Sequence, residues 1–326
     1  MTDNFLVFNH DIPQRLDIFL LELFPSCSRS FIQKRINNNN VKVNSRISKA
    51  SYKIKKGDII SYKASDFIDR GFLPDIIEPL DYKLDIIYED DNVIIINKPA
   101  GIAIHPSIGN ENNTIVNALI NYDKNIADVV HDQSSQLSLS RPGIIHRLDK
   151  DTSGIMVIAK NINTLYYLSA QIKSRNIKKI YRAICFGWPI NDSGKLINFL
   201  GRSNQNRLIY TEVGPKKGRE SILNYQVENC FKDIKNNKYS YLEFDLVTGR
   251  THQIRAQSLL LGNPIIGDKF YHTKESLSLS SNLGAIRQML HAYKLSLYLQ
   301  GDDMRSEFTA PIPEDMYSIT SSGIIT

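Results

Sequence analysis

The sequence predicts an α+β protein made of a small N-terminal module and a larger C-terminal domain. Three observations support this prediction: a length of 326 residues, an uneven distribution of charge, and strand-like apolar runs interspersed with amphipathic helical segments. A hydrophobic fraction of 42% and a charged fraction of 23% are typical of a globular protein with an ample core. We expect the module at residues 12–65, a linker at 66–82 and the larger domain at 83–326.

The positive charge of the chain is concentrated in the N-terminal module. Residues 1–63 contain 11 Lys and Arg but only 5 Asp and Glu, whereas the remaining residues hold 29 of each kind. The whole net charge of +6 therefore lies in the first fifth of the sequence. A charge run is often only a solvated surface, but an excess confined to one small module favours the binding of a polyanion.

The cysteines and the hydropathy indicate the compartment in which the protein works. Cys27, Cys185 and Cys230 are isolated, form no CxxC pair and show no metal-ligand spacing, which predicts a reduced protein without a metal. No apolar run approaches the ~18 residues of a membrane span, and the polar, acidic N-terminus is unlike a signal peptide. We therefore expect a cytoplasmic protein that does not enter a membrane.

The N-terminal module is predicted to contain two helices followed by short strands. The first helix opens at Gln14 and ends at Pro25, and its apolar face consists of Leu16, Phe19, Leu20 and Leu23. The second, basic helix begins at Ser28 or Ser30, either of which can cap it. Asparagines fill the turn at 37–40, where left-handed geometry is tolerated. Strand and turn segments follow at 41–44 and 53–58.

The larger domain is predicted to mix strands with a few helices. Apolar or alternating runs predict strands at 86–97, with a turn at 90–92, and at 143–145, 155–159, 178–184 and 239–247. Helical periodicity predicts helices at 114–122, at 161–175 and at 251–255. Polar or serine-rich composition predicts loops at 127–142 and 275–282, and a mobile surface arm at 202–220.

The stretch His146–Gly154 concentrates side chains that a simple turn does not need. It places two carboxylates, Asp149 and Asp151, beside Arg147 and Lys150 between two apolar runs. Asp151 directly precedes Thr-Ser-Gly and suits a turn, whereas Asp149 is open to two interpretations. It either caps its own backbone as a turn residue, or it acts as a nucleophile or base that a nearby cation keeps ionised.

This stretch resembles the catalytic motif His-Arg-Leu-Asp-x-x-Thr-Ser/Thr-Gly of the RluA-type RNA pseudouridine synthases. Further stretches that resemble the same family are Asn97–Gly101 with His105-Pro106, Lys179–Ala183, Thr248–Arg255, Gly262–Tyr271, Leu290–Ala292 and Phe308–Pro311. The sequence departs from the family at Gln257, where a histidine is usual. The resemblance implies a synthase domain with a central mixed, mainly antiparallel β-sheet flanked by helices.

The N-terminal module resembles the S4 RNA-binding domain. The resemblance rests on the order Ser-Arg-Ser, basic helix, Val-x-Val-Asn and Lys-x-Gly-Asp, with asparagine where the family usually has a glycine before the strand. It implies RNA contacts from Arg29, Lys34, Arg35 and Lys42. The chain is therefore expected to consist of an S4-like RNA-binding domain followed by a synthase domain.

The resemblance implies a catalytic set of Asp149, Tyr181 and Arg255. Asp149 would be the nucleophile or base that starts to break the bond between uracil N1 and the sugar, and Arg255 would hold it charged and oriented. Tyr181 would stack on the uracil and help to remove the C5 proton. The alternatives are a surface arginine at 255 and a core tyrosine at 181 that only packs in its strand.

Around this set, the resemblance implies a pocket for a base that has left the RNA stack. Arg147 would enter the stack as the base swings out, Ile254 would wall the pocket, and Lys98 would touch a phosphate. His146 is also expected at the substrate, although His146 and His252 fit no metal pattern and a structural role is favoured for both. The isomerisation gains and loses no atom, so no cofactor and no metal are expected.

The segments at 105–110, 114–119 and 141–146 are most similar to the branch of the family that acts on large-subunit ribosomal RNA. This similarity implies ribosomal RNA in a pre-50S particle as the partner of a monomeric enzyme. Two alternatives stay open: a non-catalytic RNA-binding ribosome-assembly factor, and a synthase that acts on tRNA or on other ribosomal RNA positions. The intact set of Asp149, Tyr181 and Arg255 favours an enzyme.

Overall fold

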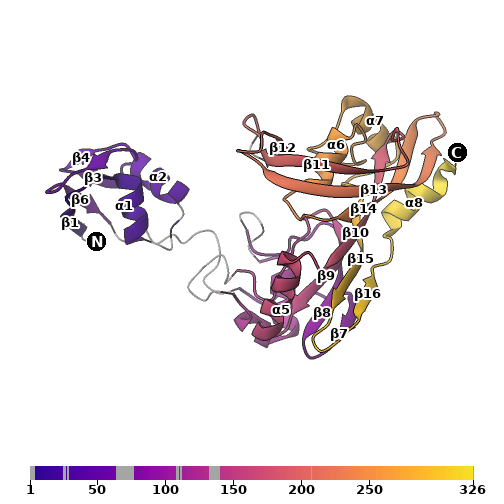
Figure 1. Ribbon diagram of the computed structural model, residues 1–326, viewed down its shortest axis with the longest axis horizontal. Helices are drawn as coiled ribbons and strands as arrows, with labels where there is room; N and C mark the ends of the chain where they lie inside the picture. Colours follow the sequence, from indigo (N-terminus) through magenta and orange to yellow (C-terminus); the bar gives the residue numbers. More distant parts are fainter. Residues whose placement is uncertain are drawn as a thin grey trace. The chain divides into compact units, whose positions relative to one another are not determined.

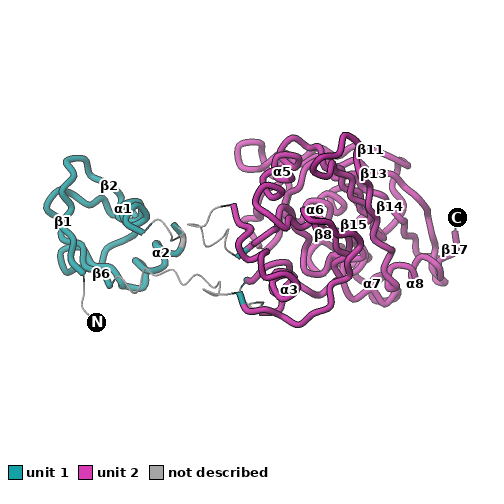
Figure 2. Tube along the Cα trace, turned by 90° about the horizontal axis from the view of Figure 1, so that it is seen from below, with its two compact units in different colours: residues 1–77, 107–111, 132–140 teal, residues 78–106, 112–131, 141–326 magenta. Residues whose placement is uncertain are grey.

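The structure, a computed structural model, describes residues 4–24, 27, 29–63, 77–107, 110, 112–131, 140–206 and 208–325 (Figure 1). It divides into one unit of residues 1–77, 107–111 and 132–140 and a second of residues 78–106, 112–131 and 141–326 (Figure 2). Most of the predicted linker lies outside the described residues, so the domain boundaries stay a prediction. In the described part of the chain, no helix has the length and apolarity needed to cross a bilayer.

The first unit contains two helices and six short strands among its described residues. In chain order they are β1 (Asn4–Val7), β2 (Gln14–Arg15), α1 (Leu16–Leu23), α2 (Arg29–Asn37), β3 (Val41–Val43), β4 (Arg46–Ile47), β5 (Lys53–Ile54) and β6 (Ile59–Tyr62). Four strands form an antiparallel sheet in the order β1-β6-β3-β4, and β2 pairs with β5. The helices bury Leu16, Leu20, Ile32 and Ile36 completely, as the helical spacing requires.

Two details of the first unit can be compared with the sequence predictions. The first helix begins at Leu16 rather than Gln14, because Gln14 and Arg15 pair with β5 as a strand. Asn39 has a φ of 65°, so an asparagine does occupy the left-handed position in the turn before β3. Pro25 and Ser28 lie outside the described residues, as does the side chain of Ser30.

The second unit is built on one large sheet. Its strands are β7 (Ile86–Glu89), β8 (Val93–Lys98), β9 (Ser153–Ala159), β10 (Lys178–Phe186), β11 (Ser193–Arg202), β12 (Tyr210–Glu212), β13 (Arg219–Lys232), β14 (Lys238–Leu246), β15 (Leu290–Tyr298), β16 (Arg305–Thr309) and β17 (Ile324–Ile325). Among the described residues the main order is β12-β11-β13-β14-β10-β15-β9-β8-β7, with β16 on β15 and β17 on β13. Among the described strands only the β15–β9 pair is parallel, which gives the mixed, mainly antiparallel sheet that the family resemblance implies.

Helices flank this sheet. They are α3 (Ile115–Tyr122), the 3-10 helix η2 (Lys124–Asp128), α5 (Ile162–Lys173), α6 (Gln253–Leu260), α7 (Lys274–Asn282) and α8 (Glu314–Ser322). Figure 1 shows α5 beside β9, and α6 contacts β11, β12 and β13. Leu279 of α7 packs in a separate cluster with Ile184 of β10 and Tyr239 of β14. The predicted helices at 114–122 and 161–175 are confirmed, and Thr114 and Asn161 cap them.

Three local predictions for the larger domain are wrong. Residues 143–145 form no strand and contribute only an isolated bridge from Ile144 to Ile158. The described part of 202–220 is not a free arm, because β12 pairs with β11. The serine-rich stretch 275–282 is helix α7, in which Thr273 and Ser276 satisfy each other's backbone N–H groups in a capping box.

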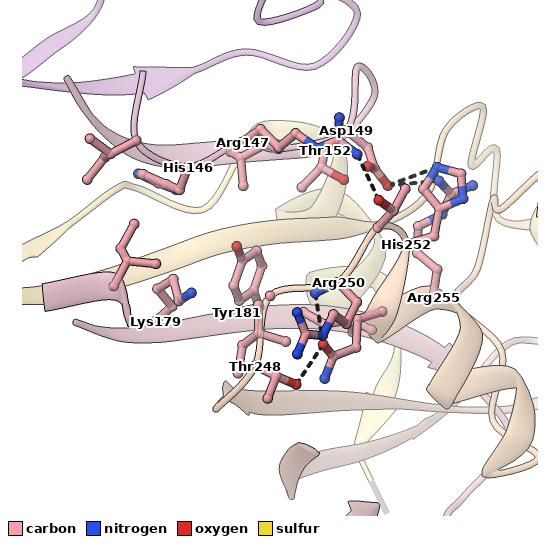
Figure 3. A pocket seen from close by; sticks show the side chains of 18 of the residues that line it. His146, Arg147, Asp149, Thr152, Lys179, Tyr181, Thr248, Arg250, His252 and Arg255 are labelled. Carbon is pink, nitrogen blue, oxygen red and sulfur yellow. Dashed lines mark hydrogen bonds and ion pairs between the residues drawn. The ribbon is translucent and has the colours of Figure 1, made fainter. Parts of the chain in front are cut away.

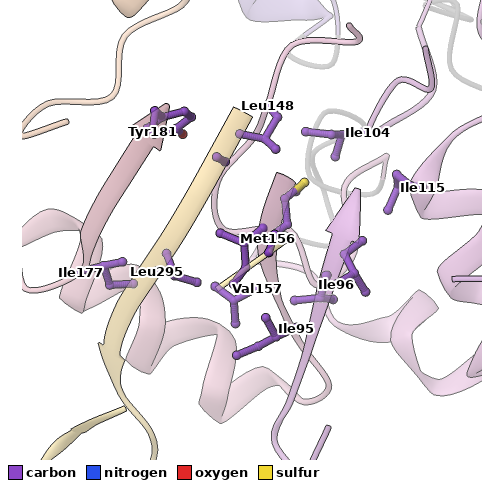
Figure 4. Close-up of a cluster of buried hydrophobic side chains, with 14 of the residues drawn as sticks. Ile95, Ile96, Ile104, Ile115, Leu148, Met156, Val157, Ile177, Tyr181 and Leu295 are labelled. Atoms are coloured by element: carbon purple, nitrogen blue, oxygen red, sulfur yellow. The ribbon is translucent and has the colours of Figure 1, made fainter. Parts of the chain in front are cut away.

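The hydrophobic core of the second unit lies along the middle strands of the sheet. Every residue of β9 is buried, and Ile95, Ile96, Met156, Val157 and Leu295 pack in one cluster. Figure 4 shows Leu148 and Tyr181 at the same end of this cluster. The core therefore fixes both the loop that carries Leu148 and the strand that carries Tyr181.

Candidate active site

The loop that carries Asp149 is held by core packing and by backbone hydrogen bonds. Leu148 points into the core with 7% of its surface exposed. The carbonyl of Lys150 accepts hydrogen bonds from Lys98 Nζ (3.0 Å) and from the N–H of Gly101 (2.9 Å). The loop therefore holds Asp149 at a defined place on the rim of the sheet.

Gly154 is required where this loop enters β9. It pairs with Ala292 on β15 and has a φ of +117°, and a Cβ there would overlap the backbone of Ala292. Ala292 also pairs with Tyr181 on its other side. This close approach of backbones places the Asp149 loop and Tyr181 on the two strands that flank β15.

Tyr181 lies at an irregularity of β10. The register of β10 against β15 shifts between Ile180 and Tyr181, and such bulges re-aim a side chain. Figure 3 shows the ring projecting from its strand toward the loop of Arg147 and Asp149. Burial, reinforced by the charge of Asp149, raises the pKa of Tyr181, so its hydroxyl is protonated at neutral pH.

Arg255 joins two carboxylates. Its Nη1 donates to Asp149 Oδ2 (2.8 Å), while Nε and Nη2 donate to the two oxygens of Asp268 (2.6 and 2.9 Å). The Arg255 side chain is 5% exposed, that of Asp268 is fully buried, and that of Asp149 is 24% exposed. Burial alone would lower the pKa of Arg255, but the two carboxylates outweigh burial and raise it. The arginine is therefore charged, and it orients Asp149 toward the open space.

His252 lies on the other side of Asp149. It precedes α6 with a φ of 55°, and its Nε2 lies 3.9 Å from Asp149 Oδ2. Its Nδ1 is hydrogen-bonded to the hydroxyl of Tyr271 at 3.0 Å. Burial lowers the pKa of His252, which favours the neutral ring, although the charge of Asp149 opposes this.

These residues surround a pocket of about 540 Å³, which is within the usual size of a ligand site (Figure 3). Asp149 is the one carboxylate among its described lining residues. The Lys and Arg residues that line it are Arg141, Arg147, Lys173, Arg175, Lys179, Arg250 and Arg255. A single acid in a strongly cationic pocket suits a polyanionic substrate that reacts at one point.

The other residues predicted at the substrate have different positions. Arg147 is exposed on the rim, and its Nη2 donates to Thr251 Oγ1 (2.8 Å). Ile254 lines the pocket with 4% of its surface exposed. His146 also lines it, but its Nε2 accepts the N–H of Val157 (3.1 Å), and burial lowers its pKa to about 3. His146 is thus a neutral histidine with a structural hydrogen bond at the pocket wall.

The prediction that Lys98 touches a phosphate is wrong. Lys98 is completely buried and does not line the pocket. Its Nζ donates to the carbonyls of Pro99 (2.6 Å), Ile102 (3.0 Å) and Lys150 (3.0 Å), which use all three ammonium hydrogens. Lys98 therefore fastens the Asp149 loop and has no donor left for RNA.

The residues predicted to contact RNA in the first unit lie on α2 and β3. Lys34 and Lys42 are exposed. Arg29 is bound to the buried carboxylate of Asp17 (3.0 Å), although half of its side chain is exposed. The guanidinium of Arg35 lies 4.7 Å from the ring centre of Phe31. Lys34 and Lys42 are thus the more accessible pair.

Sequence reasoning missed Asp268 and several cations of the pocket. Asp268 belongs to the Gly262–Tyr271 stretch, whose similarity to the family was the available signal, but no role followed from it. Lys173 and Arg175 gave no sequence signal beyond their charge. The unusual Gln257 is fully buried, and its Nε2 donates to Asn198 Oδ1 (2.9 Å), so it joins α6 to β11 without entering the pocket.

Both domains of this chain are similar in sequence to known protein families. The pattern of the RNA pseudouridylate synthase family matches residues 92–259, and that of the S4 domain matches residues 14–60. The ribosomal large subunit pseudouridine synthase D of Escherichia coli (strain K12) is 35% identical over 321 residues, which cover 96% of this chain and 91% of the relative. Its counterpart from Yersinia pestis is 34% identical over 324 residues, with coverages of 97% and 93%.

The fold has a counterpart among solved structures. Human RNA Pseudouridylate Synthase Domain Containing 1 aligns with a TM-score of 0.59 and 20% identity over 78% of this chain and 91% of that chain. The predicted α+β fold and the predicted S4 domain are thereby confirmed. The chain belongs to the RNA pseudouridine synthase family, a family of isomerases, and carries an S4 domain ahead of its catalytic domain.

Proposed function

We propose that this synthase converts uridines of large-subunit ribosomal RNA to pseudouridine, with Asp149 as the nucleophile or base that starts the reaction. The observation that carries the proposal is the position of Asp149, which is the one carboxylate among the described residues around a cationic pocket and is bonded to Arg255. Isomerisation needs one acid group beside the target base, and the pocket supplies one.

The proposed reaction assigns a role to each of three residues of the pocket. The bond between N1 and C1′ of the nucleotide breaks, the ring turns, and a bond forms between C5 and C1′ while the C5 proton leaves and N1 gains a proton. Asp149 starts the cleavage from the pocket, where its side chain is 24% exposed, and Arg255 stabilises its negative charge. Tyr181 packs against the uracil. Because its hydroxyl is protonated at neutral pH, it can take up the C5 proton only as its own proton moves to N1 of the turned uracil, which gains a proton in this reaction.

RNA as the substrate is supported by the distribution of charge. A base must leave its stack to reach Asp149, and the exposed Arg147 on the rim supports the proposal that this side chain enters the space that the base leaves. Lys34 and Lys42 on the S4 domain add cations that can contact phosphates. The relatives named ribosomal large subunit pseudouridine synthase D support ribosomal RNA over tRNA.

The proposal is tested by mapping pseudouridines in ribosomal RNA and tRNA from cells with and without the protein. Cells that lack it should lose pseudouridine at particular large-subunit positions. The wild-type protein and Asp151→Asn should restore these positions, whereas Asp149→Asn should not. Asp151→Asn is the matched control, because the same change is made two residues away at a side chain that does not line the pocket.

Other outcomes would overturn parts of the proposal. Unchanged large-subunit RNA with lost tRNA pseudouridines would replace the substrate. Restoration by Asp149→Asn would remove the catalytic role of Asp149. If ribosome assembly alone suffered while every pseudouridine remained, the protein would act as a non-catalytic assembly factor.

A further inference from the structure

Helix α5 ends with an arginine where glycine is expected. The N–H of Arg175 donates to the carbonyl of Ile172 (3.2 Å), and the N–H of Asn176 donates to that of Gln171 (2.8 Å). These are the two bonds of a Schellman motif, whose left-handed position is Arg175 with a φ of 61°. A Cβ is strained in this region, so glycine would terminate the helix better.

Among the described residues, the Arg175 side chain has no partner that would explain its presence. Its side chain is exposed and lines the pocket together with Lys173. In the described part of the chain, neither side chain forms a hydrogen bond or an ion pair. Arg182 of the same domain, by contrast, forms an ion pair with Glu243. The charge of Arg175 is therefore available to a ligand.

The pocket is lined by further cations that form no ion pair with a carboxylate among the described residues. These cations are Arg141, Lys179 and Arg250. Burial lowers the pKa of Lys179, and the charge of Asp245 opposes this shift without outweighing it. A phosphodiester group would supply the missing negative charge and the acceptor oxygens that a guanidinium matches.

We propose that Lys173 and Arg175 bind the phosphates of the RNA strand that flanks the target uridine. The inference rests on the proposed function, since it takes the pocket as the place where the RNA base enters. The ordinary explanation for cations at a helix C-terminus is the helix dipole. That explanation suits Lys173 in the last turn, but it does not explain Arg175, because glycine at that position would favour the helix end more.

The test compares Arg175→Gly, Arg175→Lys and Lys195→Gln, which removes an exposed lysine on β11 outside the pocket. Melting temperature and the affinity for a transcribed fragment of large-subunit ribosomal RNA are measured at several salt concentrations. Arg175→Gly should melt at a higher temperature yet bind RNA more weakly. The plot of its log affinity against log salt should be shallower, with the magnitude of the negative slope reduced by about one. Arg175→Lys and Lys195→Gln should keep the wild-type slope.

The opposite results would overturn the inference. If Arg175→Gly kept its RNA affinity and salt slope, no phosphate would be bound there, and a lower melting temperature would show a structural role instead. The binding measurement uses unreacted RNA and needs no turnover. It therefore tests the phosphate contact of Arg175 even if Asp149→Asn proves active and the proposed function fails.

Discussion

The orientation of Asp149 depends on a second carboxylate, Asp268, which does not line the pocket. Arg255 donates from one nitrogen to Asp149 and from two nitrogens to Asp268. Asp268 Oδ1 also accepts hydrogen bonds from the N–H groups of Phe270 and Tyr271. Only a guanidinium has donors in a planar fork that can join two carboxylates in this way. The orientation of Asp149 is therefore determined by a buried ion pair behind it.

Replacing Arg255 with lysine should nearly abolish activity. An ammonium group is a single point and cannot hold Asp149 and Asp268 together, so one buried carboxylate loses its partner at a cost of about 3 kcal/mol. We expect a loss of about 100-fold in the single-turnover rate of tritium release from [5-³H]uridine RNA, with RNA affinity largely kept. Activity near that of the wild type would show that Arg255 is not part of the site.

Asp268→Asn tests the positioning role separately. The amide accepts fewer bonds from Arg255 and turns a donor toward it, so the guanidinium should tilt away from Asp149. We expect the rate at saturating RNA to fall about tenfold, equivalent to ~1.4 kcal/mol in the barrier, with an unchanged RNA dissociation constant. A variant with a lowered melting temperature but a normal rate would assign Asp268 to stability alone.

At the scale of elements, the site is assembled by strands that meet at Ala292. Ala292 pairs with Gly154 on one side and with Tyr181 on the other. Lys98 at the end of β8 then fastens the Asp149 loop through the carbonyl of Lys150. The sheet thus places the carboxylate and the tyrosine, and one buried lysine fixes the loop between them.

Lys98→Met should loosen this loop. Methionine keeps the length of the side chain but leaves three carbonyls without their donor, at about 1 kcal/mol or more for each group. We expect the free energy of unfolding to fall by about 3 kcal/mol in urea titrations, and turnover to decrease more than RNA binding. Stability equal to that of the wild type would show that the three hydrogen bonds contribute nothing.

The sequence predicts the elements of this domain better than it predicts their ends and connections. Strands around 86–97 and 178–184 have strong apolar patterns, and burial follows those patterns. Helix α7 is missed because serine has a low helix propensity, which the capping box at Thr273 and the buried Leu279 outweigh. The pairing of β12 with β11 depends on tertiary contacts that no local pattern reveals.

The residues of the candidate site were also only partly predictable from the sequence. The sequence pattern singles out Asp149 and Arg255, which lie 106 residues apart and are in contact in the structure. The role of Asp268 could not be predicted, because it depends on the path of the chain after α6. Lys98 was misassigned because a cation beside a motif suggests a ligand, whereas only the fold shows that three carbonyls surround it.

At the scale of the whole molecule, buried histidines make stability depend on pH. Burial lowers the pKa of His105 and of His291 to about 4 and that of His146 to about 3. His291 is completely buried between Ser153 Oγ (2.9 Å) and the carbonyl of Ala310 (3.3 Å), which suits its neutral form. Acid therefore favours the unfolded chain, in which these rings can take up protons.

The free energy of unfolding should fall as the pH drops from about 6.5 to about 4. In this range the unfolded histidines bind protons and the folded ones do not, and each contributes up to about 1.4 kcal/mol per pH unit. Urea titrations at pH 7 and pH 5 measure the effect, and His291→Gln should make the dependence shallower. A stability that stays constant over this range would contradict the burial of neutral histidines.

The central claim is that Asp149 starts the isomerisation of a uridine held in a cationic pocket. The most direct measurement is tritium release from [5-³H]uridine ribosomal RNA under single turnover, with wild type, Asp149→Asn and Asp151→Asn. We predict release by the wild type and by Asp151→Asn, and none by Asp149→Asn, which should still bind the RNA. Release by Asp149→Asn at the wild-type rate would contradict the claim.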